Sequence, residues 1–188
     1  KLTGTKDSVF VNYDGENPQS GHILCGKTTE FTPGQAKAEG ISTEAGLVNA
    51  IALGFNDITV IGSKAVALTD DLVIPEKTTI HANNSITVNP EVILENNGTI
   101  EFADQMVLTV SGSAAATATG AAKSGATLRN NGTIAAADKA SYTIAVPAGA
   151  TIINDGTMDI YAVTGGIQGA FENNGTLNVK GDFTIGDD

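Results

Sequence analysis

Charged and aromatic side chains are scarce in this sequence. Of its 188 residues, 16% are charged and 5% are aromatic, and there is no tryptophan. Basic residues are the rarer sign, since 10 Lys and Arg stand against 21 Asp and Glu for a formal net charge of −11. An acidic chain is repelled by phosphate backbones and anionic lipid surfaces, so we expect no nucleic-acid partner.

Cysteine and long apolar runs are also scarce. Cys25 is the only cysteine, which excludes an intrachain disulfide and a metal site built from several thiolates, so we expect a small, partly buried hydrophobic residue there. No apolar run approaches the ~18 to 20 residues of a membrane-spanning helix, and no such segment is expected. The chain begins at Lys1 rather than Met, as it would after removal of a signal peptide or after editing of the sequence.

Glycine and small polar residues, by contrast, are plentiful. Gly occurs 22 times, and Ala, Thr, Asn and Ile are abundant. This composition is typical of short strands joined by tight turns. The length suits a single domain, or one domain with a small cap.

A short motif recurs four times in the second half of the chain. The copies are VILENNGTIEF from Val92, ATLRNNGTIAA from Ala126, ATIINDGTMDI from Ala150 and GAFENNGTLNV from Gly169. Two of the three intervals between copies are close to the ~20 to 25 residues of one coil in a three-sided β-helix. The longer first interval contains small residues at 111–125, which we expect to form a loop inserted into the wall.

The Asn-Gly and Asp-Gly pairs of the motif predict sharp corners. Glycine reaches positive φ without a steric penalty, and asparagine tolerates it. Coils stacked ~4.8 Å apart would place the second asparagine of each copy in a hydrogen-bonded ladder along one corner. We expect a structural rather than a ligand-binding role for the turn positions, which are Asn97, Gly98, Asn131, Gly132, Asp155, Gly156, Asn174 and Gly175.

Two architectures are compatible with this pattern. Asn-Gly between alternating apolar residues is the strongest sequence signal for a β-hairpin, so an antiparallel meander is the rival. Hairpins would recur every ~8 to 12 residues, whereas these copies leave room for two further strands. From residue 57 onward, apolar and polar residues alternate as in strands with one buried face. We therefore predict an all-β fold, a right-handed parallel β-helix (solenoid) with an N-terminal capping α-helix.

The segment STEAGLVNAIALG, residues 42–54, is the predicted helix. Ser42 or Thr43 can cap it, and Glu44 favours its positive end. Its apolar stripe contains Leu47, Val48, Ala50, Ile51 and Leu53. A helix laid over the first coil would hide unpaired strand edges and an open core. The expected order is an irregular or strand segment (1–40) with a strand-like run at 9–13, the capping helix (41–56) and the β-helix (57–188).

The run LVIPEKTTI from Leu72 follows a helix and two predicted strands. It resembles the opening of pectate-lyase-like right-handed parallel β-helix proteins, in which an I-P-E/G turn begins a coil. The NNGT coils after it are similar to adhesin-like surface solenoids of Bacteroides-type bacteria. The resemblance covers residues 41–188, and its motifs are degenerate. Because the pectate-lyase-like group includes polysaccharide lyases and hydrolases, catalytic groups must be sought individually.

No catalytic, cofactor-binding or metal-binding residue is predicted. Arg129 is the only arginine and lies inside a motif copy, where an exposed turn position is expected. Asp70 and Asp71 are neighbours, which point to opposite faces of a strand, so a polar corner is expected there. His22 and His81 lack metal-ligand partners at recognisable spacing, which favours ordinary surface or packing roles.

The threonine of each motif copy recurs once per coil, as on an ice-binding surface. A single column directly after a turn is narrower than the paired ranks that such a surface would need, so ice binding is not the expected function. The four residues are Thr99, Thr133, Thr157 and Thr176.

These observations favour a non-catalytic, extracellular structural or adhesive β-solenoid of a bacterial surface protein, secreted or held on the extracellular side of an outer membrane. Expected partners are extracellular glycans or host or bacterial surface proteins, contacted through a flank or the 111–125 insertion, and no cofactor is expected. The alternative is a carbohydrate-active enzyme of pectate-lyase-like fold, a polysaccharide lyase or glycoside hydrolase, with three or more charged side chains converging on one groove. A third interpretation is the terminal portion of a longer solenoid, because the final FTIGDD lacks an obvious cap.

Overall fold

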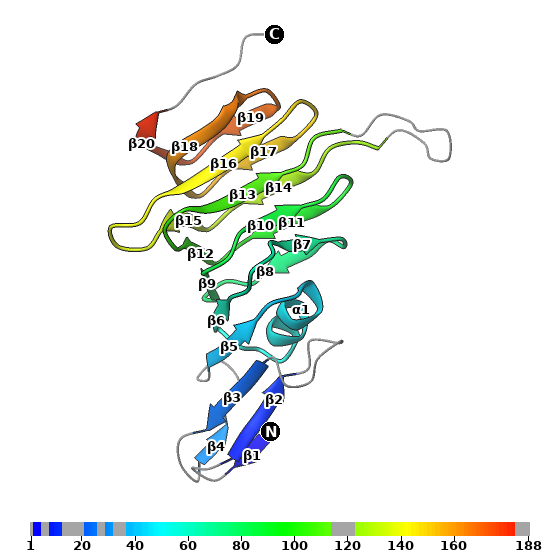
Figure 1. Ribbon diagram of the computed structural model, residues 1–188, viewed down its shortest axis with the longest axis vertical. Helices are drawn as coiled ribbons and strands as arrows, with labels where there is room; N and C mark the ends of the chain where they lie inside the picture. Colours follow the sequence, from blue (N-terminus) through cyan, green and yellow to red (C-terminus); the bar gives the residue numbers. More distant parts are fainter. Residues whose placement is uncertain are drawn as a thin grey trace.

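The computed structural model describes residues 37–113 and 123–181, together with the backbone of Asp182 and of four strands near the amino terminus. These strands are β1 (Leu2–Gly4), β2 (Ser8–Asn12), β3 (Gly21–Cys25) and β4 (Thr29–Phe31). The pairs β2–β3 and β1–β4 are antiparallel, and β3 also pairs antiparallel with β5 (Lys37–Ile41). The antiparallel pair β2–β3 lies near one end of the molecule, and β18 to β20 lie at the other (Figure 1).

The remaining strands form three parallel stacks. The first stack contains β5, β6 (Asp57–Val60), β9 (Thr79–Ala82), β12 (Thr99–Phe102), β15 (Thr133–Ala136), the first part of β18 (Thr157–Ile167) and β20 (Thr176–Asp182). The second contains β7 (Val66–Leu68), β10 (Ile86–Val88), β13 (Met106–Val110), β16 (Tyr142–Val146) and the second part of β18. The third contains β8 (Leu72–Ile74), β11 (Ile93–Asn96), β14 (Thr127–Asn130), β17 (Thr151–Asn154) and β19 (Ala170–Asn173).

From β6 onward, the chain visits the three stacks in turn, so each coil lies on the one before it. The motif copies pair in parallel and in register, with Leu94 opposite Leu128 and Leu128 opposite Ile152. The predicted all-β solenoid is therefore confirmed, and the antiparallel meander is wrong for these coils. The sheet also extends before the helix, because β5 pairs in parallel with β6.

The core lies between the stacks and is built from columns of buried side chains. One column runs through Ile58, Ile80, Ile100, Ile134 and Met158, none of which is exposed. In the next column the large Phe102 lies between two alanines, Ala82 and Ala136. The ring of Tyr142 stacks on that of Phe102 with centroids 4.8 Å apart. Each coil thus buries its apolar face against its neighbours, which is the main favourable term in folding.

The helix α1 (Glu44–Ala52) packs against β2, β5, β6 and β7, near the start of the coils. Thr43 is its N-cap and accepts a hydrogen bond from Gly46 N at 3.2 Å. Leu47 and Ala50 are buried as predicted. Val48 and Leu53 are 40% and 49% exposed, so the predicted stripe was too wide. The buried residues of this helix are Gly46, Leu47 and Ala50.

The corners differ from the predicted geometry. None of the four motif glycines has positive φ, whereas Lys77, Glu91, Gln105 and Lys139 do, with φ between 61° and 70°. The motif glycines are required by close approach instead. A Cβ on Gly132 would lie 2.0 Å from the carbonyl oxygen of Gly98 in the coil below, and Gly98, Gly156 and Gly175 are similarly crowded.

Candidate functional site

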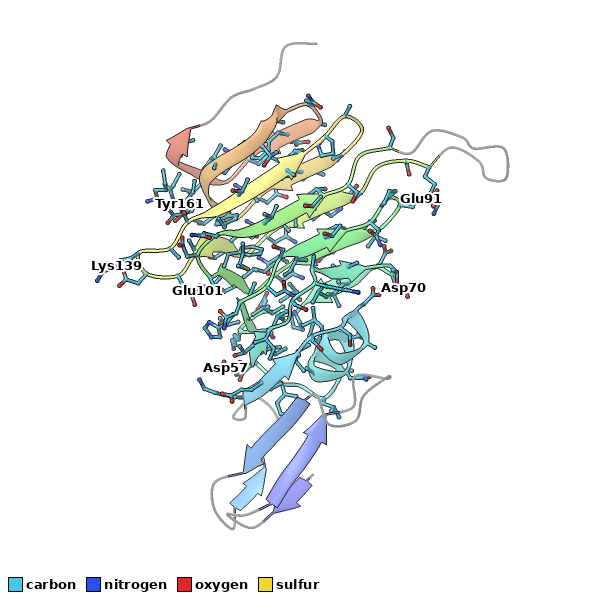
Figure 2. The ribbon with its side chains drawn as sticks, viewed as in Figure 1. Asp57, Asp70, Glu91, Glu101, Lys139 and Tyr161 are labelled. Atoms are coloured by element: carbon cyan, nitrogen blue, oxygen red, sulfur yellow. The ribbon has the colours of Figure 1, made fainter. Side chains whose placement is uncertain are left out.

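A chain of charged side chains crosses the outer face of the first stack. Lys37 Nζ lies 3.1 Å from Asp57 Oδ2, and Asp57 Oδ1 lies 3.4 Å from His81 Nε2. The other ring nitrogen, His81 Nδ1, lies 2.9 Å from Glu101 Oε2. Each of these side chains belongs to a different strand, from β5 through β6 and β9 to β12. Asp57 and Glu101 lie along the same side of the solenoid (Figure 2).

The chemistry of this charged chain is that of a partly exposed acid–base group. Only a protonated imidazole can donate to both carboxylates, and Asp57 Oδ1 accepts no hydrogen bond although it is buried. The His81 and Glu101 side chains are 36% and 35% exposed, so solvent reaches the group. Lys37 and Asp57 are paired with each other, and His81 Nδ1 lies within hydrogen-bonding distance of Glu101.

Sequence reasoning gave His81 an ordinary surface or packing role and did not connect it with the two carboxylates. The signal that could have found the chain is the coil period. Thr59, His81 and Glu101 occupy one outward column because β6, β9 and β12 are in parallel register. His22 lies in β3, of which only the backbone is described, so its predicted role lies outside the described side chains, as does that of Cys25.

The outer face of the second stack carries no charge. Its outward residues are small or β-branched, and they alternate with the buried core positions of β7, β10, β13, β16 and β18. In a chain of net charge −11 this makes the second stack chemically distinct from the first. We call it the neutral flank, made of Ala67, Thr87, Val107, Thr109, Thr143, Ala145, Ala162 and Thr164.

The third stack carries the only arginine. Arg129 is exposed in the middle of strand β14 rather than at the predicted turn. Its strand neighbours are Glu95 in β11 and Ile153 in β17. This face therefore mixes charged and apolar side chains and includes the half-exposed Val73. The predicted insertion begins where β13 ends, and its residues 114–122 lie outside the described residues.

Two asparagine ladders follow the corner between the third and first stacks. The outer ladder contains the predicted turn positions: Asn131 Nδ2 donates to Asn97 Oδ1 at 2.8 Å, and Asn174 Nδ2 donates to Asp155 Oδ1 at 2.9 Å. No hydrogen bond joins Asn131 and Asp155 among the described residues. These contacts give the turn residues a structural use.

The inner ladder was not predicted. It uses the first asparagine of each motif copy, which points into the core. Asn96, Asn130 and Asn154 are fully buried, and each donates to the asparagine of the next coil at 2.7 Å. Each also donates to the carbonyl of a threonine in the next coil, so the buried amide nitrogens are paired. Asn96 Oδ1, at the start of the ladder, is buried and accepts no hydrogen bond from any described residue.

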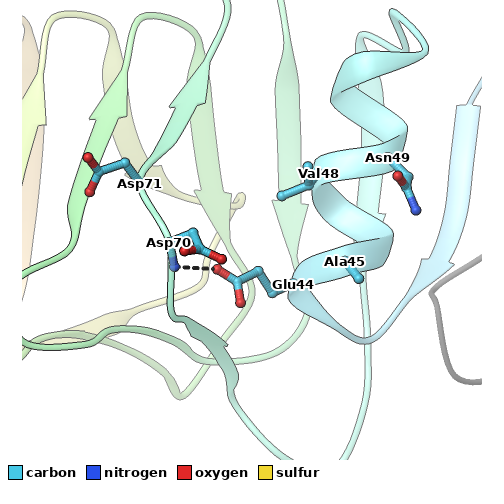
Figure 3. A pocket seen from close by; sticks show the side chains of 6 residues that line it. All are labelled: Glu44, Ala45, Val48, Asn49, Asp70 and Asp71. Carbon is cyan, nitrogen blue, oxygen red and sulfur yellow. Dashed lines mark hydrogen bonds between the residues drawn. The ribbon is translucent and has the colours of Figure 1, made fainter.

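A shallow depression of about 310 Å³ lies between α1 and the turn before β8 (Figure 3). Glu44 Oε1 accepts hydrogen bonds from the backbone of Thr69 at 2.6 Å and of Asp70 at 2.9 Å. Asp71 points away and accepts from Ile93 N at 2.8 Å. Glu44 therefore joins α1 to the turn before β8, and Asp71 joins that turn to β11 in the next coil. Among the described residues, no group of three or more His, Cys, Asp or Glu is placed to hold a metal ion.

The motif threonines form one outward column, in which Thr79 precedes the four predicted positions. The neighbouring outward column contains His81 and Glu101, so the first stack lacks the paired threonine ranks of an ice-binding surface.

The hydroxyl of Tyr142 lies in the core and has a perturbed pKa. Burial, together with the charges of Asp159 and Tyr161, raises the pKa of its hydroxyl far above the ordinary value of 10.0. The hydroxyl donates to the carbonyl oxygen of Asp159. This tyrosine is therefore a neutral core residue at ordinary pH.

No protein-family model matches this chain, and comparisons with curated proteins and with solved structures gave no significant match. No helix in the described ranges is both long and apolar enough to cross a membrane.

Proposed function

We propose that this chain is a non-catalytic structural or adhesive module of a bacterial surface protein, secreted or held outside the cell, that contacts a glycan or a protein through one flank. The observation that supports it best is the neutral flank. Five parallel strand segments present small uncharged side chains in register, on a chain whose other described faces carry charge. A regular, rigid array of this kind suits repeated weak contacts with an extended partner.

The acidic surface agrees with this proposal. It favours solubility and disfavours anionic polymers, so a neutral glycan or a protein is the expected ligand class. The resemblance of the NNGT coils to adhesin-like solenoids of Bacteroides-type bacteria, and of the LVIPEKTTI run to pectate-lyase-like proteins, motivates the surface location and the choice of ligands.

The test is a glycan-array and surface-protein binding screen with two matched variants. Thr109→Glu places a charge on the neutral flank, and Thr133→Glu places the same charge on the first stack. Both threonines are partly buried outward residues in the middle of their sheets. Binding should be lost in Thr109→Glu and retained in Thr133→Glu. Retention in the first variant, or equal loss in both, would contradict the role of this flank.

A second candidate function is a carbohydrate-active enzyme, a lyase or hydrolase. The observation that favours it is the charged chain of Lys37, Asp57, His81 and Glu101, because acid–base catalysis of glycan cleavage needs such groups. Turnover assays on neutral polysaccharides and polyuronates test it. Activity that disappears in both Asp57→Asn and Glu101→Gln would establish the enzyme and overturn the non-catalytic proposal.

A further inference from the structure

We propose that Asn97 is the site at which this folded chain deamidates spontaneously, ahead of its other Asn-Gly pairs. Asn-Gly is the reactive dipeptide because glycine leaves its amide nitrogen free to approach the asparagine side chain. The chain has three such pairs, at Asn97, Asn131 and Asn174, each within the sequence Asn-Asn-Gly-Thr. Because the local sequence is the same, differences between them in the folded protein come from the structure.

The attacking nitrogen is free only at the first pair. Gly132 N donates to Asn96 O at 2.9 Å, and Gly175 N donates to Asn154 O at 2.9 Å. These bonds must break before either nitrogen can lose its proton and attack. At the first pair, the Ile74 carbonyl oxygen in the preceding coil accepts a hydrogen bond from Asn97 N at 2.9 Å instead. No described group accepts a hydrogen bond from Gly98 N.

The side chain under attack is also activated only at the first pair. Asn97 Oδ1 accepts a hydrogen bond from Asn131 Nδ2 at 2.8 Å, and a donor in this place stabilises the negative charge that develops on the oxygen. Above Asn131 stands Asp155, whose carboxylate has no hydrogen to give. No described residue donates to Asn174 Oδ1. Two independent features therefore select Asn97: its attacking nitrogen is not hydrogen-bonded to a described residue, and its side-chain carbonyl oxygen accepts a hydrogen bond.

The reaction needs only water. Gly98 N bonds to Asn97 Cγ, the bond from Cγ to Nδ2 breaks, and ammonia leaves with the proton that Gly98 N gives up. Water then opens the resulting cyclic imide. Cleavage at Cγ gives aspartate, and cleavage at the former backbone carbonyl gives isoaspartate. No atom is oxidised or reduced.

The product would weaken this corner. Asn97 Nδ2 now donates to Glu95 Oε1 at 2.9 Å, so aspartate at position 97 would place two carboxylates side by side. Isoaspartate would add a backbone atom where Gly98 already lies so close to the Thr78 carbonyl oxygen that a Cβ would come within 2.3 Å. We expect the aged protein to show a lower Tm.

The test is peptide mapping by mass spectrometry after incubation of the full folded chain at mildly alkaline pH. Conversion at Asn97 should be several-fold faster than at Asn131 or Asn174. The same chain in denaturant is the control, where the three rates should converge. Faster conversion at Asn131 or Asn174, or three equal rates in the folded chain, would overturn the proposal.

A variant distinguishes activation of Asn97 by this hydrogen bond from an effect of local backbone mobility. Asn131→Ala removes the donor to Asn97 Oδ1, so the rate at Asn97 should fall several-fold. A corner that was merely loosened would react faster instead. Asp155→Ala, which alters the same ladder without touching Asn97, should leave that rate unchanged. An unchanged or increased rate in Asn131→Ala would refute the assigned role of the hydrogen bond.

Discussion

Asp155 occupies the position that is asparagine in the other motif copies, and it interrupts the outer ladder. It accepts from Asn174 Nδ2 but has no hydrogen to offer Asn131. Asp155→Asn should supply the missing donor and raise the free energy of unfolding by about 0.5 to 1 kcal/mol, a modest value because this corner is exposed. Denaturant unfolding would measure the change. Asp155→Ala is the control, and an equal gain in that variant would attribute the effect to lost negative charge.

The buried hydroxyl of Tyr142 should make the folded chain less stable at alkaline pH. Its folded-state pKa is raised above 10.0 by burial, so above that pH the unfolded chain loses this proton while the folded chain keeps it. Its contribution to stability is therefore complete below pH 10.0 and is lost at about 1.4 kcal/mol for each pH unit above it.

Tyr142→Phe separates the two effects of this hydroxyl. At neutral pH the variant should lose about 1 kcal/mol, because the hydrogen bond to Asp159 O is gone. Above pH 10.0 its free energy of unfolding should fall less steeply than that of the wild type. Urea unfolding across this range measures both, and parallel alkaline slopes would contradict the assignment.

At the scale of the element, the glycine corners depend on close stacking rather than on backbone conformation. Gly132→Ala would force a Cβ to within 2.0 Å of the Gly98 carbonyl oxygen, and should cost about 3 kcal/mol, the upper end for overpacking. Gly165→Ala is the matched control, since Gly165 has open space but φ of +70°. It should cost about 1 to 2 kcal/mol of backbone strain. Thermal unfolding of both variants checks the order, and a larger loss at Gly165 would contradict it.

The sequence predicted the strands and their stacking because the NNGT motif repeats at nearly one coil. It did not predict what depends on the third dimension. The inner position of Asn96 follows from strand phase, and the link between His81 and Glu101 follows from the register of two coils. The left-handed corners at Lys77 and Gln105 carry no glycine or asparagine to signal them. Local sequence patterns therefore predicted the repeating coil, whereas the side-chain contacts between coils became apparent only in the structure.

At the scale of the whole molecule, each coil touches mainly its two neighbours, so stability is approximately a sum of coil and interface terms. The coil at residues 133–156 begins at Thr133, which lies opposite Thr157 of the next coil. Removing residues 133–156 would join Gly132 to Thr157 without changing the phase of any remaining strand. Ile100 would then face Met158, and Asn130 would face Asn173, both pairings of the kind already present.

We expect this coil deletion to fold, with the circular dichroism of a β-solenoid, and to unfold at a lower temperature because one set of interfaces and the Phe102–Tyr142 stack are gone. A deletion of residues 133–146 is the control. It removes fewer residues but takes β15 and β16 and leaves β17, so the chain would have to close a coil without two of its three sides. That shorter deletion should abolish cooperative unfolding. If it were the better tolerated of the two, stability would not be carried by complete coils in register.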